Sequence, residues 1–164
     1  MKQIKVMDTS FRDGFQSVYG ARVFVDFAHT PSALRSVLGV IRKLSGNKRR
    51  IVSMFGHGGG RYQQNRPELG KAASEFANEI IITSDNARDE DPADIAKAIA
   101  NGATIPHKTI TDRPEAVKFA LDNLKPGDIL VITGKGPEKF ITIKDKKIPF
   151  NDAEAVKAWR DSHE

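Results

Sequence analysis

A cluster of polar and charged residues follows the most apolar stretch of this sequence. Residues 80–82 are all isoleucine, and Asp85, Asn86 and Arg88 come before a helix pattern that begins at Pro92. A central parallel strand delivers side chains in this way to the carboxyl edge of a sheet, where ligands bind. A guanidinium beside a carboxylate and an amide suits an amino-acid ligand. A capped helix start with ordinary loop polars fits this stretch equally well, so both interpretations stay open here.

Two other loops also have the composition of a ligand-binding edge. Residues 56–61 and 134–138 follow apolar strands, are rich in glycine, and contain Arg61 and Glu138. Glycine lets the backbone approach a ligand closely, and its amide groups can bind anions. Because the carboxyl ends of parallel strands share one edge, all three loops can converge on one ligand. Neither loop has the spacing of a phosphate-binding P-loop, and no nucleophile elbow is present, so no catalytic residue is predicted.

The histidines and the absence of cysteine argue against a metal centre. The chain has four histidines and no cysteine. No spacing among the histidines is typical of metal ligands, and without thiols there can be no thiolate site and no disulfide. His29 follows a strand at the same edge of the sheet, where a lone histidine more often donates a loop hydrogen bond than catalyses a reaction. We therefore predict no metal site.

The overall composition is that of one soluble domain. The chain has 164 residues, of which 39% are hydrophobic and 29% charged, with a net charge of +5. No apolar run is long enough to span a bilayer, so no membrane partner is expected, and the lack of cysteine fits a cytoplasmic location. Basic residues gather around one helix end without interleaved aromatics, which favours a solvated face over a nucleic-acid groove. The sequence leaves the oligomeric state open.

Strand and helix patterns alternate along most of the chain. We predict strands at 4–7 and 22–27 around a polar, glycine-containing connection, and further strands at 51–55, 79–83, 108–110 and 129–133. A hairpin is predicted at 140–150. Helices are predicted at 31–44, from residue 67, at 92–100, from 112 to about 124, and at 152–159. This order predicts a Rossmann-like three-layer α/β domain. It has a mostly parallel sheet of about six strands, helices on both faces, and hairpin elements at the N- and C-termini.

From about residue 23 to residue 163 the chain resembles the C-terminal domain of the Mur ligases. It is most similar to the type that adds diaminopimelate or lysine to UDP-N-acetylmuramoyl-L-alanyl-D-glutamate. The matching blocks keep their order and spacing, and they are residues 25–31, the glycine-rich loop through Arg61 with Arg66-Pro67, residues 83–88, residues 90–92, residues 125–128 and residues 134–138.

The resemblance implies a role for each matching residue. The domain would bind the incoming amino acid and close over the nucleotide, while the full-length family uses ATP and Mg²⁺ to activate the substrate carboxylate in the bacterial cytoplasm. Diaminopimelate would be held by Arg61, Asp85, Asn86, Arg88, Gly134 and Glu138. Arg88 would clamp the far carboxylate and Glu138 would take an ammonium, with Asp26 and His29 on the nucleotide side. An arginine at position 88 favours diaminopimelate over lysine, which has no second carboxylate.

The sequence also departs from the family pattern. Several family side chains at the functional edge are replaced, at Ser32, Gly60, Tyr62, Gln63, Ala87 and Pro137. The UDP-sugar domain and the ATPase domain with its P-loop have no counterpart, so the resemblance implies no cofactor and no ligation activity for this chain alone. Two functions therefore stay open: the amino-acid-binding domain of a ligase, or a chimeric α/β scaffold with no retained activity.

The first 22 residues resemble a different family. Residues 6–23 are similar to the opening strand and loop of the carboxyltransferase barrel of pyruvate and oxaloacetate carboxylases, in which the position of Asp13 ligates a metal. The histidine ligands of such a site have no counterpart here. We therefore divide the chain at residues 22 and 23. An engineered or recombined chimera explains the division, and so does a Mur-type domain with an unusual N-terminal hairpin; the unbroken match favours the chimera.

Overall fold

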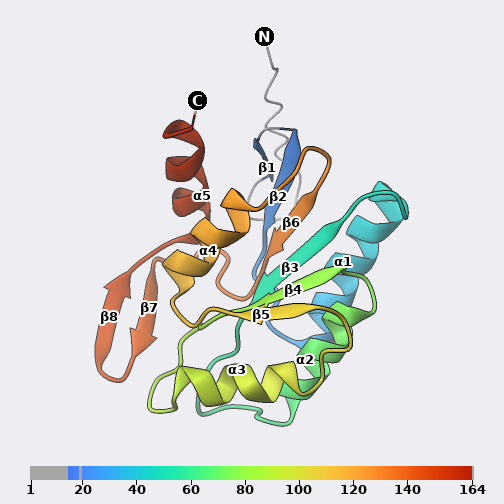
Figure 1. Ribbon diagram of the computed structural model, residues 1–164. Helices are drawn as coiled ribbons and strands as arrows, with labels where there is room; N and C mark the ends of the chain where they lie inside the picture. Colours follow the sequence, from blue (N-terminus) through green and yellow to red (C-terminus); the bar gives the residue numbers. More distant parts are fainter. Residues whose placement is uncertain (1–14, 19, 164) are drawn as a thin grey trace.

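The computed structural model describes residues 15–18 and 20–163. At its centre is a six-stranded sheet with the spatial order β1-β2-β6-β3-β4-β5 (Figure 1). The strands from β2 to β5 in this order are parallel to their neighbours, and β1 is antiparallel to β2. The strands are β1 (Phe15–Val18), β2 (Ala21–Val25), β3 (Ile51–Phe55), β4 (Glu79–Ile82), β5 (His107–Thr109) and β6 (Ile129–Ile132). The predicted fold class is confirmed.

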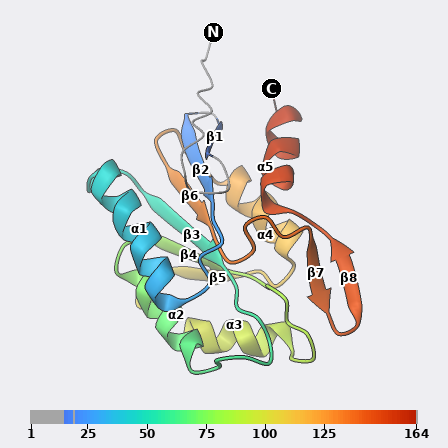
Figure 2. The same cartoon turned by 180° about the vertical axis from the view of Figure 1, so that it is seen from behind.

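Within the described part of the chain, five helices cover the two faces of this sheet (Figures 1 and 2). They are α1 (Pro31–Ser45), α2 (Asn65–Ser74), α3 (Pro92–Ala100), α4 (Arg113–Asp122) and α5 (Asp152–Asp161). Buried side chains of α1, α2 and α3 share one core cluster with one face of the sheet, while α4 and α5 share a second cluster with the other face. The result is the three-layer arrangement expected from alternating strands and helices.

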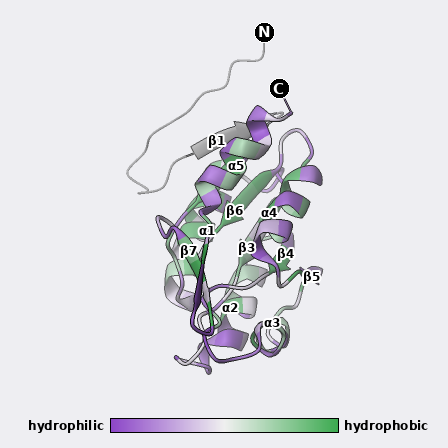
Figure 3. Cartoon of the chain, turned by 90° about the vertical axis from the view of Figure 1, so that its left-hand side faces the viewer, coloured by the Kyte–Doolittle hydropathy of each residue, from purple (hydrophilic) through white to green (hydrophobic). Residues whose placement is uncertain are grey.

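The apolar strands explain why both faces are covered. In β4, Ile80 and Ile82 belong to the core beneath α1–α3, whereas Ile81 belongs to the core beneath α4 and α5. Successive side chains of a strand point to opposite faces, so a continuous apolar run has to be buried on both sides. Figure 3 shows these central strands as the most hydrophobic segments, between helices that are mixed in hydropathy.

Side chains that cap the first turn mark most of the helix starts. The side chains of Thr30 and Asp112 accept hydrogen bonds from backbone amides in the first turns of α1 and α4. Asp91 and Asn151 cap α3 and α5 in the same way. The second helix begins at Asn65, two residues before the predicted start at Pro67, because proline occupies the first turn of a helix and not necessarily its first position.

One hairpin lies beside the central sheet, and another forms its edge. β7 (Phe140–Ile143) and β8 (Lys146–Pro149) form the predicted C-terminal hairpin, which projects from the body of the molecule in Figure 1. At the other end, β1 lies in the segment predicted to be a connection, and it pairs with β2 at the edge of the sheet. The strand predicted at 4–7 lies outside the described residues.

A buried ion pair joins α4 and α5 to the carboxyl edge of the sheet. Arg113 contacts both carboxylate oxygens of Asp152, at 2.9 and 2.8 Å, and both side chains are fully buried. The same guanidinium donates to the carbonyl oxygens of Ser84 and Thr133, both at 3.0 Å. Burial alone would lower the pKa of Arg113, but the Asp152 carboxylate, together with the charges of Asp85 and Glu138, raises that pKa above its ordinary value. The two strand ends after β4 and β6 are thereby held together.

Replacing Asp152 with alanine should be strongly destabilising. The substitution leaves the Arg113 charge buried without its counterion, and we expect the free energy of unfolding to fall by about 3–5 kcal/mol. The matched control is Lys118→Ala, which breaks an exposed ion pair with Asp122 and should cost about 0.5 kcal/mol or less. Denaturant unfolding of both variants measures these changes, and equal losses would contradict the importance of the buried pair.

Candidate functional site

Four loops meet at the carboxyl edge of the sheet. They follow β2, β3, β4 and β6, which are contiguous in the sheet. Together they line a hollow of about 230 Å³, which we call the edge hollow; it is lined by Phe27, His29, Thr30, His57, Gly58, Arg61, Tyr62, Asn65, Asp85, Asn86, Arg88, Gly134 and Glu138. A hollow where parallel strands end is the ordinary ligand site of an open α/β sheet.

The structure brings together most of the residues singled out in the sequence. All six predicted amino-acid-binding residues line the edge hollow, namely Arg61, Asp85, Asn86, Arg88, Gly134 and Glu138. His29 lines it as well, and its Nδ1 lies 2.9 Å from the carbonyl oxygen of Phe27. Asp26 does not line it, and its carboxylate accepts a hydrogen bond from the amide of Ala28. The roles of these residues stay predictions.

A buried lysine lies beneath the acidic side of the hollow. Lys135 is fully buried, and its Nζ lies 2.6 Å from Glu138 Oε2, 3.1 Å from Asn86 Oδ1 and 3.5 Å from Asp85 Oδ1. Asn86 also donates to Glu138 Oε2 over 2.9 Å. An added Cβ at Gly134, where φ is +108°, would lie 3.1 Å from Asp85 Oδ2, so the cluster needs glycine there. One ammonium therefore links side chains from two loops.

Arg88 is held in an unusual backbone conformation. Its φ is 53°, a left-handed value that is uncommon for residues other than glycine. Backbone hydrogen bonds to the β7–β8 hairpin fix this conformation, because the Arg88 amide donates to Thr142 O and the Lys144 amide donates to Arg88 O. Its Nη1 donates to the carbonyl oxygen of Gly59 over 2.5 Å. The hairpin thus directs the guanidinium across the hollow toward the glycine loop.

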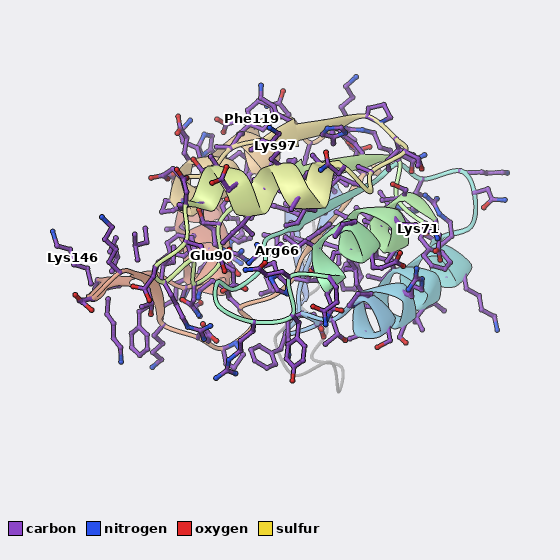
Figure 4. All side chains as sticks on the ribbon, turned by 90° about the horizontal axis from the view of Figure 1, so that it is seen from below. Arg66, Lys71, Glu90, Lys97, Phe119 and Lys146 are labelled. Carbon is purple, nitrogen blue, oxygen red and sulfur yellow. The ribbon has the colours of Figure 1, made fainter. Side chains whose placement is uncertain are left out.

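The glycine loop after β3 is anchored by a second ion pair. Arg66, at the start of α2, contacts Glu90 over 2.8 Å, and Figure 4 shows the two side chains side by side. Glu90 also accepts a hydrogen bond from the amide of Gly60 over 2.6 Å. These contacts with Arg66 and Gly60 lower the pKa of Glu90 from 4.5 to about 2. Burial, followed by the nearby Arg66, lowers the pKa of His57.

Several residues of this site were not singled out in the sequence. The sequence places Lys135 in a glycine-rich loop and a matching block, and Arg66 in a matching block, without indicating a role for either. It gives no local indication that Arg113 and Asp152 form a pair. The one local signal was the position of Lys135 between two glycines directly after a buried strand. The other residues act through partners that are distant in the sequence, such as Glu90 for Arg66.

Five of the altered family positions can be placed in or beside the loops of the hollow. Gly60, with φ +71°, donates its amide to Glu90, and Gln63 Nε2 lies 3.5 Å from the same carboxylate. Tyr62 is exposed and lines the hollow, whereas Ala87 is fully buried. Ser32 Oγ lies 3.3 Å from Oγ1 of the capping Thr30.

Among the described residues, no group of three or more histidine, cysteine, aspartate or glutamate side chains could hold a metal ion. Within the same part of the chain, no helix is long and apolar enough to cross a membrane.

Comparison with known protein families identifies the family of this chain. The family model described as "Mur ligase, glutamate ligase domain" matches residues 14–136, which is more than half of the chain. The chain belongs to the Mur ligase family. It corresponds to the C-terminal domain of these peptidoglycan-precursor ligases.

Curated relatives and solved structures agree with this assignment. The UDP-N-acetylmuramoyl-L-alanyl-D-glutamate–2,6-diaminopimelate ligase of Aquifex aeolicus is 47% identical over 137 residues, covering 82% of this chain and 28% of the ligase. The ligase of the same name from Rickettsia typhi is 40% identical over 145 residues, covering 88% of the chain and 30% of the ligase. The Mur domain described here therefore spans less than a third of the length of these relatives.

A solved structure of a UDP-N-acetylmuramoyl-L-alanyl-D-glutamate–2,6-diaminopimelate ligase has a TM-score of 0.82 and 33% identity, covering 99% of this chain and 32% of that one. A folylpolyglutamate synthase from Thermotoga maritima has a TM-score of 0.57 and 17% identity, covering 77% of this chain and 28% of that one, and it shares the fold.

These findings do not support a carboxylase-barrel origin for residues 1–22. The Mur ligase match begins at residue 14, inside the segment expected to be foreign, and the ligase structure covers nearly the whole chain. The chimera interpretation is likewise unsupported. Residues 1–14 and 19 lie outside the described residues, so the division at residues 22 and 23 stays a prediction.

Gly59 is required where the glycine loop contacts Ala87. An added Cβ at Gly59 would lie 1.9 Å from the carbonyl oxygen of Ala87, whereas one at Gly58 would lie no closer than 3.7 Å to its nearest neighbour, the carbonyl oxygen of Asn86. Gly59→Ala should therefore lower the free energy of unfolding by about 1–3 kcal/mol, whereas Gly58→Ala should change it by less than about 1 kcal/mol. Denaturant unfolding compares them, and equal stability of the two variants would refute the close contact.

The Glu90 contacts should make stability depend on acid pH. Because the folded-state pKa is lowered from 4.5 to about 2, ionised Glu90 stabilises the fold above about pH 4.5, and this contribution is lost as the pH falls toward 2. The wild type should therefore exceed Glu90→Gln in free energy of unfolding near neutral pH, and the difference should shrink below about pH 4.5. Denaturant unfolding across this range tests it; a constant difference would contradict the assignment.

Proposed function

We propose that this Mur domain binds the incoming amino acid of a peptidoglycan-precursor ligase, and that the amino acid is meso-diaminopimelate. The observation that carries the proposal is the meeting of the Arg88 guanidinium with the Asp85 and Glu138 carboxylates in one hollow. Such a set of side chains suits a small ligand with carboxylate and ammonium groups at both ends. The two curated relatives described above are named as diaminopimelate ligases, which supports the choice of ligand.

Arg88 is suited to binding the far carboxylate. Its Nη1 donates to Gly59, and its other N–H groups have no hydrogen-bond partner within the described part of the chain. A guanidinium with free N–H groups can bind a carboxylate through two parallel hydrogen bonds, which a lysine side chain at this position of the protein could not form. Arg61 lines the same hollow and adds positive charge. Lysine lacks the far carboxylate and would leave these groups unpaired.

The acidic side of the hollow is suited to binding the far ammonium. Asp85 Oδ1 accepts a hydrogen bond from the backbone amide of Asn86. Glu138 Oε2 accepts hydrogen bonds from Lys135 Nζ and from the side-chain amide of Asn86. Oδ2 of Asp85 and Oε1 of Glu138 accept no hydrogen bond from any described residue, so they are available to a ligand. Gly134 lets the backbone come close to this group.

The remaining steps of ligation belong to the complete enzyme. In the family, ATP with Mg²⁺ activates the substrate carboxylate that the amino group then attacks, and we propose that this occurs in the bacterial cytoplasm. His29 and Phe27 fit a nucleotide-facing position, because their rings lie 4.8 Å apart in an exposed loop beside the hollow. Asp26 fits a role in shaping that loop through its hydrogen bond to Ala28.

An NMR titration of this chain tests the proposal. Adding meso-diaminopimelate should give saturable shifts at Arg61, at residues 85–88 and at residues 134–138, with weaker or no shifts for lysine. Arg88→Ala should weaken diaminopimelate binding by about 10- to 100-fold, because a carboxylate then loses its charged hydrogen-bond partner. The matched control is Lys71→Ala, which removes one positive charge from an exposed position of α2 away from the hollow.

The outcomes are distinct. Loss of binding in Arg88→Ala but not in Lys71→Ala supports an amino-acid site. Well-dispersed spectra that do not change with either ligand would refute the proposal and favour the alternative of a scaffold without retained activity. Equal weakening in both variants would indicate a general charge effect and not a site at Arg88.

A further inference from the structure

The buried ammonium of Lys135 sets the charge beneath the edge hollow. The side chain is fully buried, and all three of its polar contacts are to groups that line the hollow: Glu138, Asn86 and Asp85. A buried charge of this kind is tolerated only where it is paired and hydrogen-bonded. Lys135 is therefore a fixed internal cation, held within 3.5 Å of both carboxylates of the site.

The charges in and directly beneath the hollow are more positive than negative. Arg61 and Arg88 line the hollow and Lys135 lies buried beneath it, against the two lining carboxylates of Asp85 and Glu138. Glu90 lies close by, but it is already paired with Arg66. Without Lys135, the cations and carboxylates would balance.

We propose that Lys135 is a specificity-determining residue, which disfavours ligands that end in a bare ammonium and favours ligands whose ammonium is accompanied by a carboxylate. This inference rests on the proposed function. A bare ammonium near Asp85 and Glu138 is repelled by the Lys135 charge, since like charges a few ångströms apart in a partly buried site interact strongly. An end that carries both groups is neutral, and Arg88 attracts its carboxylate.

This role is separate from that of Arg88. Arg88 lines the hollow and offers free N–H groups to a carboxylate, whereas Lys135 does not line the hollow and is already saturated by its three partners. Lys135 therefore acts on a ligand in two indirect ways: through the electrostatic field of its charge, and by holding the Glu138 carboxylate in position. Its removal should change which ligand is preferred more than it changes binding as a whole.

Three ligands with closely related carbon skeletons test the inference. Meso-diaminopimelate has no net charge, 2-aminopimelate lacks the distal ammonium and is an anion, and lysine lacks the distal carboxylate and is a cation. For the wild-type chain we expect affinity to fall in the order meso-diaminopimelate, 2-aminopimelate, lysine. Isothermal titration calorimetry or NMR titration gives the three dissociation constants.

The variants then assign the effect to Lys135. Lys135→Met removes the charge with little change in length, and the ratio of the dissociation constants of lysine and 2-aminopimelate should fall by about tenfold or more. Lys135→Arg keeps the charge and should keep the ratio nearer to that of the wild type. Lys135→Gln is a second neutral variant that retains a hydrogen-bond donor for Glu138, and it replaces the methionine variant if amide spectra show that the latter does not fold.

Each result decides the question. A lower ratio in a folded neutral variant, with the ratio kept in Lys135→Arg, supports the inference. An unchanged ratio in a folded neutral variant overturns it, as does a wild-type chain that binds lysine at least as tightly as 2-aminopimelate. A wild-type chain that binds meso-diaminopimelate without this discrimination overturns the inference alone, whereas one that binds none of the three overturns the proposed function as well.

Discussion

The buried contact between Arg113 and Asp152 is the constraint on which the site depends. A single guanidinium satisfies a carboxylate at the start of α5 and the carbonyl oxygens that end two parallel strands. Those strand ends lead directly into the loops that carry Asp85 and Lys135. Displacing either strand end would leave part of this buried charge without its hydrogen-bond partners, which is costly. The starts of the two loops are therefore held from within the core.

Around this fixed point, the site is built from charges supplied by separate loops. Lys135 connects the loops after β4 and β6, and the pair of Arg66 and Glu90 connects α2 with the loops after β3 and β4. Arg88 reaches from the loop after β4 to the carbonyl oxygen of Gly59. The loops after β3, β4 and β6 are thus each held by a charged group from another loop or helix, although few residues of the hollow lie in regular secondary structure.

The sequence was sufficient for the fold and for much of the hollow, but not for the groups that hold it together. Asp85, Asn86 and Arg88 could be placed because they follow an apolar strand, and parallel strands end at a common edge. Lys135 and Arg113 could not, because their partners lie far along the chain: Lys135 and Asp85 are separated by 50 positions, and Arg113 and Asp152 by 39. Local patterns carry no information about such pairings. The strand at residues 15–18 was missed because a short edge strand needs little apolar patterning.

The backbone conformation of Arg88 depends on the β7–β8 hairpin, whose local stability differs from that of the core. Among the described residues, its two strands pair with each other and, through an isolated bridge, with the backbone of Arg88, and β8 is exposed to solvent. Segments with few buried contacts open at a lower free energy than the core. When this hairpin opens, the left-handed backbone of Arg88 loses the hydrogen bonds that maintain it, while the central sheet remains folded. Hydrogen exchange at the hairpin would thus report the lifetime of a competent guanidinium, independently of global unfolding.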